Sequence, residues 1–95
     1  MSQTSSVFHN PSAGLFELRT ESGTASLRYA YRGADLDLIH TEVPDSEEGQ
    51  GYGSALAKAA LEYAQSERVT VVPSCPFVRR YIESHPEYAG LVAQG

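Results

Sequence analysis

The chain has 95 residues, which gives it room for one domain and not for two. Its formal net charge of −5 argues against a nucleic-acid-binding role, because a negative chain has no general attraction to phosphate backbones. Its single cysteine, Cys75, excludes an internal disulfide, and no apolar run approaches the roughly 20 residues of a membrane-spanning helix. We therefore expect a cytoplasmic protein without nucleic-acid or membrane partners.

The first half of the chain is rich in strand patterns. Residues 1–6 are small and polar, so we expect a flexible N-terminus ahead of a single domain over residues 7–95. Within that domain, residues 15–19, 25–31 and 36–43 carry short or alternating apolar patterns separated by turn-like residues. Three strands arranged in this way are predicted to form an antiparallel meander.

The third of these segments carries two candidate functional side chains. Strict alternation would put one set of residues on one face: Leu36, Leu38, His40 and Glu42. The other set would face the opposite way: Asp37, Ile39, Thr41 and Val43. On this pattern, His40 and Glu42 are expected to line one cleft together.

The second half of the chain is mainly helical in pattern. Residues 52–66 are rich in alanine, and spacings of three and four form an apolar face from Tyr52, Leu56, Ala59, Ala60 and Tyr63. Residues 69–72 are short and β-branched, which is typical of a buried strand. Residues 77–84 are predicted to form a second helix, which Pro86 stops. The order β-β-β-loop-α-β-α indicates an α+β fold with a mixed sheet.

A glycine-rich loop from Glu48 to Ser54 (EGQGYGS) joins the meander to the first helix. Glycines at alternate positions permit positive φ angles and let a ligand approach the backbone. Free amides in the first turn of the helix, with the positive end of its dipole, would suit a pyrophosphate. The loop lacks the lysine of a Walker motif and does not follow the first strand of a βαβ unit, so neither of those motifs fits. A flexible turn that caps the helix is the alternative.

The loop resembles the Arg/Gln-x-x-Gly-x-Gly/Ala motif of the GNAT superfamily of acyl-CoA transferases, with Gly51 and Gly53 at the two small positions. Three further segments resemble its short YjdJ-like branch: residues 40–44 (HTEVP), 73–78 (PSCPFV) and 85–88 (HPEY). The four motifs follow the order and spacing of that branch. One position departs from the pattern, because Glu48 stands where the superfamily has arginine or glutamine, and a carboxylate there would repel a pyrophosphate.

The resemblance implies a GNAT-like fold and acetyl-CoA or CoA as cosubstrate. The residues that it implies for binding are Val43, Gly49, Gln50, Gly51, Tyr52, Gly53, Ser54 and Cys75. Arg79 and Arg80 could help to hold the CoA phosphates, or could simply be solvated. The acetyl thioester would lie where the strand that ends at Val43 separates from the strand at residues 69–72. The branch lacks the helical substrate-binding insertion of larger GNAT members, which would leave the cleft open.

Four side chains are catalytic candidates. The resemblance implies Glu42 as the general base for an acceptor amine, with a solvent-exposed strand carboxylate as the alternative. His40 titrates in the useful range, and a structural histidine is its alternative. Cys75 precedes a helix, where a lowered thiol pKa would allow an acyl-cysteine, or else it packs as a small buried residue. Tyr81 falls near the family tyrosine that protonates the departing CoA thiolate, or it packs in the core.

These residues lead to two hypotheses of function. The first is an N-acetyltransferase that moves the acetyl group of acetyl-CoA to an unidentified amine or protein acceptor by direct attack on the thioester. The second is a CoA-binding or protein-interaction module without turnover, which the acidic loop and the missing insertion favour. The open cleft fits a monomer or a weak homodimer that completes the site. No set of side chains has the spacing of metal ligands, so we expect no metal.

Overall fold

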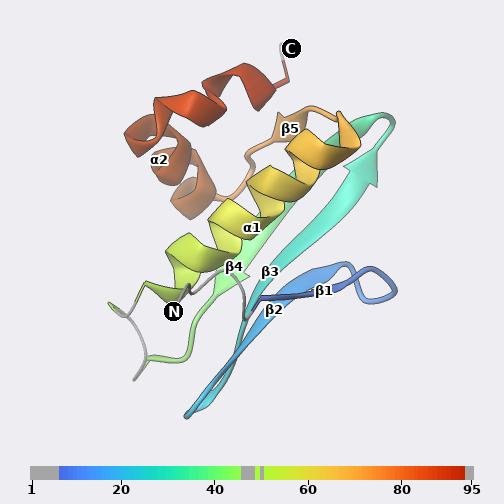
Figure 1. The fold of residues 1–95 in the computed structure, drawn as a ribbon. Helices are drawn as coiled ribbons and strands as arrows, with labels where there is room; N and C mark the ends of the chain where they lie inside the picture. The colour runs from blue at the N-terminus through green and yellow to red at the C-terminus, as the bar shows by residue number, and fades with distance from the viewer. Residues whose placement is uncertain (1–6, 46–48, 50, 94–95) are drawn as a thin grey trace.

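The computed structural model describes residues 7–45, 49 and 51–93 of the chain. Its elements, drawn in Figure 1, are β1 (Phe8–Asn10), β2 (Leu15–Thr20), β3 (Gly23–Arg32), β4 (Asp35–Glu42), α1 (Tyr52–Glu67), β5 (Val71–Val72), α2 (Pro76–Ser84) and the 3-10 helix η3 (Pro86–Leu91). Every strand and helix predicted from the sequence is present, with ends shifted by at most two residues. Strand β1 and helix η3 were not predicted. The predicted flexible segment, residues 1–6, lies outside the described residues.

The five strands form one mixed sheet in the order β1-β2-β3-β4-β5. The first four strands pair antiparallel as a meander, and β5 pairs in parallel with β4. A parallel pair needs a crossover connection, which α1 supplies. The pairing of β4 with β5 covers only Leu36 with Val71 and Asp37 with Val72. The predicted α+β fold with a mixed sheet is therefore confirmed.

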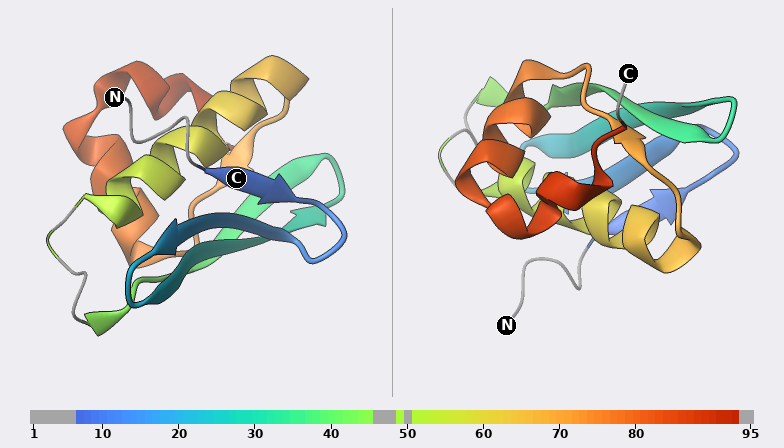
Figure 2. Two further views of the ribbon diagram at one scale, coloured as in Figure 1. Left: turned by 60° about the horizontal axis from the view of Figure 1, so that its bottom comes forward. Right: turned by 90° about the horizontal axis from the view of Figure 1, so that it is seen from above.

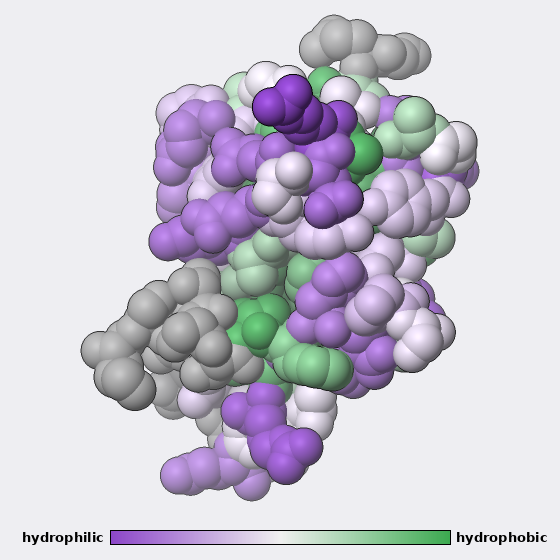
Figure 3. All heavy atoms as spheres, turned by 45° about the vertical axis from the view of Figure 1, so that its right-hand side comes forward, coloured by the Kyte–Doolittle hydropathy of each residue, from purple (hydrophilic) through white to green (hydrophobic). Residues whose placement is uncertain are grey.

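Helices α1 and α2 lie on the same face of the sheet (Figure 2, left), so the molecule has two layers. One core cluster fills the space between the layers, and its largest fully buried side chains are Leu27, Leu36, Leu38, Leu56, Leu61, Val71 and Val78. In the described part of the chain no helix covers the opposite face of the sheet, where Arg28 and Ala30 of β3 are exposed. Figure 3 shows one side of the molecule, on which hydrophilic residues predominate and apolar residues gather near the middle.

A β-bulge interrupts β4 at Ile39. Tyr29 of β3 pairs with Leu38, and the preceding residue, Arg28, pairs with His40. Ile39 is therefore an extra residue in β4 that has no partner of its own in this ladder. Because side chains alternate with a period of two, one extra residue shifts all later side chains of β4 to the other face.

The bulge decides which side chains at the end of β4 face the helices. Thr41 pairs with Leu27, a fully buried residue of the helix-facing side, so Thr41 points toward the helices. His40 and Glu42 point to the opposite, uncovered face, and both are exposed. The prediction that they share a face with Leu38 is wrong, because the sequence pattern does not reveal the extra residue.

Helix α1 buries a broader surface than its pattern predicted. Its buried residues are Gly53, Ala55, Leu56, Ala57, Ala60, Leu61 and Ala64. Tyr52, Ala59 and Tyr63, which were predicted to face inward, are only partly buried. The reason is that α1 packs against the sheet and also against α2 and η3, so a wider arc of the helix is covered. None of the described helices is both long and apolar enough to cross a bilayer.

Both edges of the sheet are short. Strand β1 has three residues, and Pro11 follows it directly. Strand β5 has two residues, and Val71 bridges in parallel to Val92. The N–H of Ala93 donates to the carbonyl oxygen of Val71 at 2.8 Å. The last described residues therefore lie along the outer side of β5.

An aromatic cluster around His9 holds β1 against the rest of the molecule. The His9 ring stacks on Phe16 with centroids 4.4 Å apart, and it meets Tyr63 edge-on at 4.6 Å. Its Nε2 is hydrogen-bonded to the hydroxyl of Tyr29 at 2.6 Å. Burial lowers the pKa of His9, although the charge of Glu67 acts in the opposite direction. The folded state therefore favours the neutral imidazole.

The free energy of unfolding is expected to fall as the pH drops below 6.5, the ordinary pKa of histidine. The pKa of His9 is lower in the folded than in the unfolded chain, so the unfolded chain binds the proton first. The stabilisation is complete above the unfolded pKa and is lost as the pH falls through the folded pKa. Denaturant titrations across this range measure the effect. His9→Phe should lose this part of the pH dependence, and His40→Gln, a control at an exposed site, should keep it. Identical profiles of unfolding free energy against pH for the wild type and both variants would refute the assignment to His9.

Candidate functional site

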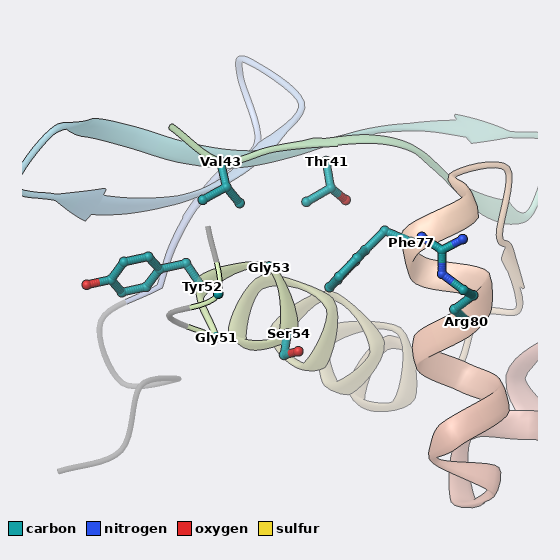
Figure 4. Close-up of a pocket in the computed structure, with 9 residues that line it drawn as sticks. Thr41, Val43, Gly51, Tyr52, Gly53, Ser54, Phe77 and Arg80 are labelled. Carbon is teal, nitrogen blue, oxygen red and sulfur yellow. The ribbon is translucent and has the colours of Figure 1, made fainter. Parts of the chain in front are cut away.

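A pocket of about 640 Å³ opens beside the start of α1. Its walls come from the end of β4, from the glycine-rich loop with the first turn of α1, and from α2 (Figure 4). The residues that line it are Thr41, Val43, Gly49, Gly51, Tyr52, Gly53, Ser54, Phe77 and Arg80. The structure thus brings together six of the residues predicted to bind the cofactor. A seventh, Gln50, lies outside the described residues. So does Glu48, the residue that differs from the family motif.

Gly51 begins α1 in the left-handed conformation that favours glycine, with φ 84° and ψ 9°. Gly51 is the N-cap residue of α1 and has no side chain with which to cap the helix. The N–H of Ala55 donates to the carbonyl of Gly51 at 3.0 Å. The N–H groups of Tyr52, Gly53 and Ser54 precede this bond, so they have no acceptor within the helix. N–H groups at such a helix start can donate to an anion placed in the pocket.

Gly53 is a glycine for a different reason. It is buried in the first turn of α1, and a Cβ atom added there would lie 2.9 Å from Cζ of Phe77. A Cβ added at Gly51 would have no atom of the described residues within 4 Å, its chain neighbours apart. The two small positions of the motif therefore have separate roles: Gly51 sets the backbone conformation at the pocket, and Gly53 allows α1 to approach α2.

Cys75 lies next to the pocket and outside its lining. Its side chain is 3% exposed, and its Sγ is 3.4 Å from Oγ1 of Thr41, which does line the pocket. The N–H of Cys75 donates to the carbonyl of Leu38 at 2.9 Å and so ties the start of α2 to β4. Burial raises the pKa of Cys75, but hydrogen bonds from Thr41 and from the backbone N–H groups of Val78 and Phe77 outweigh it, and the pKa is lowered overall.

Native Cys75 is expected to react more than about tenfold more slowly with iodoacetamide than the same thiol in the unfolded chain. A lowered pKa supplies thiolate, but reaction also needs access, and burial restricts access to local opening of the fold. Mass spectrometry of timed samples measures both rates. As a control, Ser84→Cys in a Cys75→Ser background puts a thiol at an exposed site of α2 and should label quickly. Equal native rates for the two proteins would show that Cys75 is accessible.

The other three catalytic candidates lie elsewhere. His40 and Glu42 are exposed on the face of the sheet that the helices do not cover. Tyr81 stacks on His85 with ring centroids 4.0 Å apart, at the junction of α2 with η3, and its pKa is raised by burial. None of the three lines the pocket. Of the four candidates, the structure places only Cys75 against the wall of the pocket.

Two residues of the pocket, Thr41 and Phe77, were given no site role by the sequence prediction. Arg80 was weighed together with Arg79, as a contact of the CoA phosphates or as a solvated side chain, and of the two only Arg80 lines the pocket. Thr41 was assigned to the wrong face because the bulge at Ile39 has no sequence signature. Phe77 and Arg80 are three positions apart in α2, a spacing that puts two side chains on the same side of a helix. That spacing was the signal that could have identified Phe77 beside Arg80.

The fold and the pocket together define a class of protein. The model of the GCN5-related N-acetyltransferase family matches residues 15–91, which include every described residue of the pocket. The chain belongs to this family. The match confirms the resemblance to the GNAT superfamily that the sequence motifs indicated.

Relatives and a solved structure agree with this assignment. Over 63 residues the chain is 40% identical to protein NATD1 of Mus musculus, which covers 65% of this chain and 57% of that protein. It is 31% identical to protein NATD1 of Danio rerio over 87 residues, covering 86% and 79% respectively. The chain therefore spans less than two thirds of the length of the mouse relative. The solution structure of a GCN5-like protein from Staphylococcus aureus matches the fold with a TM-score of 0.74, at 24% identity, over 100% of this chain and 93% of that one.

Proposed function

We propose that this protein binds acetyl-CoA in the pocket at the start of α1 and transfers the acetyl group to an amine. The observation that carries the proposal is the start of α1, where the first-turn N–H groups of Tyr52 to Ser54 have no acceptor within the helix and all three residues line the pocket beside the left-handed Gly51. Such a helix start suits a pyrophosphate. The volume of about 640 Å³ lies within the range of roughly 300–1,000 Å³ that is usual for small-molecule sites. Membership of the family supports the same ligand.

Transfer requires the amine nitrogen to attack the thioester carbon, while the CoA thiolate leaves and the amine loses a proton. We place the thioester near Thr41 and Val43, where β4 continues beyond its pairing with β5. Backbone N–H groups of β4 are the proposed donors to the oxyanion. Because His40 and Glu42 face away from the pocket, we assign neither as the base. We propose Cys75 as a packing residue that supports Thr41 from behind.

A second candidate function is acetyl-CoA binding without turnover. The observation that favours it is the chemistry of the wall: among the described lining residues there is no carboxylate and no imidazole. A general base of the usual kind is therefore missing from the described part of the site. Binding of CoA with no release of free thiol in the presence of amines would support this candidate over the first.

The test has two stages. Amide chemical shifts recorded during a titration with acetyl-CoA should change most at Gly49, from Gly51 to Ala55, and at Thr41. Uniformly small changes at millimolar ligand would remove both candidate functions. A turnover assay that measures free CoA thiol, with panels of amines and lysine peptides as acceptors, then separates transfer from binding alone.

The acceptor and the setting are part of the proposal. The formal net charge of −5 favours a cationic acceptor, which we take to be an amine or a lysine-bearing protein rather than a nucleic acid. The free thiol of Cys75 is in keeping with a reducing compartment such as the cytoplasm. We propose a monomer or a weak homodimer, which sedimentation at several protein concentrations would distinguish from a stable oligomer.

A further inference from the structure

One charged side chain stands among the described residues that line the pocket. It is Arg80, which is exposed and lies one turn of α2 beyond Phe77. Figure 4 shows Arg80 and Phe77 on α2, with the glycine-rich loop on the other side of the pocket. No carboxylate in the described part of the chain forms an ion pair with Arg80. The ion pair found among the described residues joins Arg32 to Asp37. The guanidinium of Arg80 is thus not committed to the described parts of the fold.

The neighbouring Arg79 has the same charge in a different setting. Its Nη2 donates to the carbonyl of Ser74 at 3.2 Å, so this guanidinium closes the turn between β5 and α2. Arg79 does not line the pocket, because successive residues of a helix point about 100° apart. The pair therefore offers two adjacent cations on one helix, one bound to the fold and the other facing the pocket.

The loop itself lacks the cation of its motif, since Glu48 stands at the Arg/Gln position. A chain with a net charge of −5 also repels a polyanionic ligand at long range. A cation at the pocket would offset both effects. A guanidinium is suited to this task, because its planar fork donates two charge-assisted hydrogen bonds to phosphate oxygens.

We propose that Arg80 binds the phosphate groups of CoA and takes over, from α2, the role that the loop arginine or glutamine has in the family motif. This inference rests on the proposed function, because it names how the same pocket holds its ligand. The phosphates lie between the guanidinium of Arg80 on α2 and the first-turn N–H groups of α1.

The test is a calorimetric titration of CoA and of pantetheine, which lacks the phosphates, into the wild type, Arg80→Gln and Arg79→Gln. Arg80→Gln should weaken CoA binding by about tenfold or more, and the loss should shrink as the salt concentration rises. Arg79→Gln removes the same formal charge from the next residue and should change CoA affinity by less than about twofold. Pantetheine should bind all three proteins alike.

Three results would overturn the inference. CoA affinity unchanged in Arg80→Gln would show that Arg80 does not contact the phosphates. Equal losses of CoA affinity in Arg80→Gln and Arg79→Gln would show that the ligand responds to the overall positive charge of α2 and not to Arg80 in particular. A matching loss for pantetheine would show that Arg80 only shapes the pocket. As a readout without substitution, the Arg80 Nε–Hε signal should shift with CoA and not with pantetheine. Failure of the wild type to bind CoA would instead overturn the proposed function, and this inference with it.

Discussion

Gly51→Val is expected to abolish CoA binding while the protein still folds. Gly51 lines the pocket, and apart from its chain neighbours no atom of the described residues lies within 4 Å of a Cβ added there, so the valine side chain would enter the proposed ligand site. The left-handed backbone at Gly51, with φ +84°, would also cost a β-branched residue about 1–3 kcal/mol of stability. Calorimetric titration of CoA and denaturant unfolding measure the two effects separately.

Gly33→Val provides the matched control. Gly33 lies in the turn between β3 and β4, has a φ of +62°, and likewise has no atom within 4 Å of an added Cβ. It does not line the pocket. Both variants should therefore lose similar stability, and only Gly51→Val should lose CoA binding. Normal CoA affinity in Gly51→Val would mean that the ligand does not approach the start of α1.

Gly53→Ala is expected to weaken CoA binding by about tenfold or more with little change in stability. The added Cβ would lie 2.9 Å from Cζ and 3.1 Å from Cε2 of Phe77, so the ring must move. Phe77 lines the pocket, so a displaced ring changes the shape of the pocket. Alanine is favoured over glycine in a helix by about 1 kcal/mol, which offsets part of the lost packing.

The double variant Gly53→Ala with Phe77→Leu separates steric from direct effects. A smaller side chain at position 77 leaves room for the methyl group, so CoA affinity should return to that of Phe77→Leu alone. Titrations of the two single variants and the double variant form the cycle. Additive losses in the double variant would contradict a clash between residues 53 and 77 as the cause.

The order of the elements could be predicted because each long element carries its own local signal. An alanine-rich sequence with apolar spacings of three and four predicted that α1 begins at Tyr52. The glycines before it predicted the loop that precedes the helix. Strand β1 carries no such signal, since its three residues precede Pro11 and depend on the contacts of His9 with Phe16 and Tyr63. Those contacts form only when distant segments have come together.

The candidate site was predicted less completely than the fold, and most of the errors in the predicted site residues come from one residue, Ile39. The glycine motif located Gly49 and the stretch Gly51–Ser54 correctly at the pocket. The bulge at Ile39 is a property of how β4 pairs with β3, and Ile39 suits a regular strand as well as a bulged one. Because of the bulge, Thr41 faces the pocket, whereas His40 and Glu42 face the opposite side of the sheet.

The short edges of the sheet affect how molecules of this protein meet each other. An exposed strand edge is a template on which another chain can add a strand and start an aggregate. Here β1 offers three residues before Pro11, which has no N–H to donate, and the outer side of β5 is engaged by Val92 and Ala93. Neither edge of the described sheet therefore offers a long row of unpaired backbone groups on which another strand could add. Two copies that meet through the described part of the chain therefore have the side chains on its faces, more than its strand edges, as contact surface.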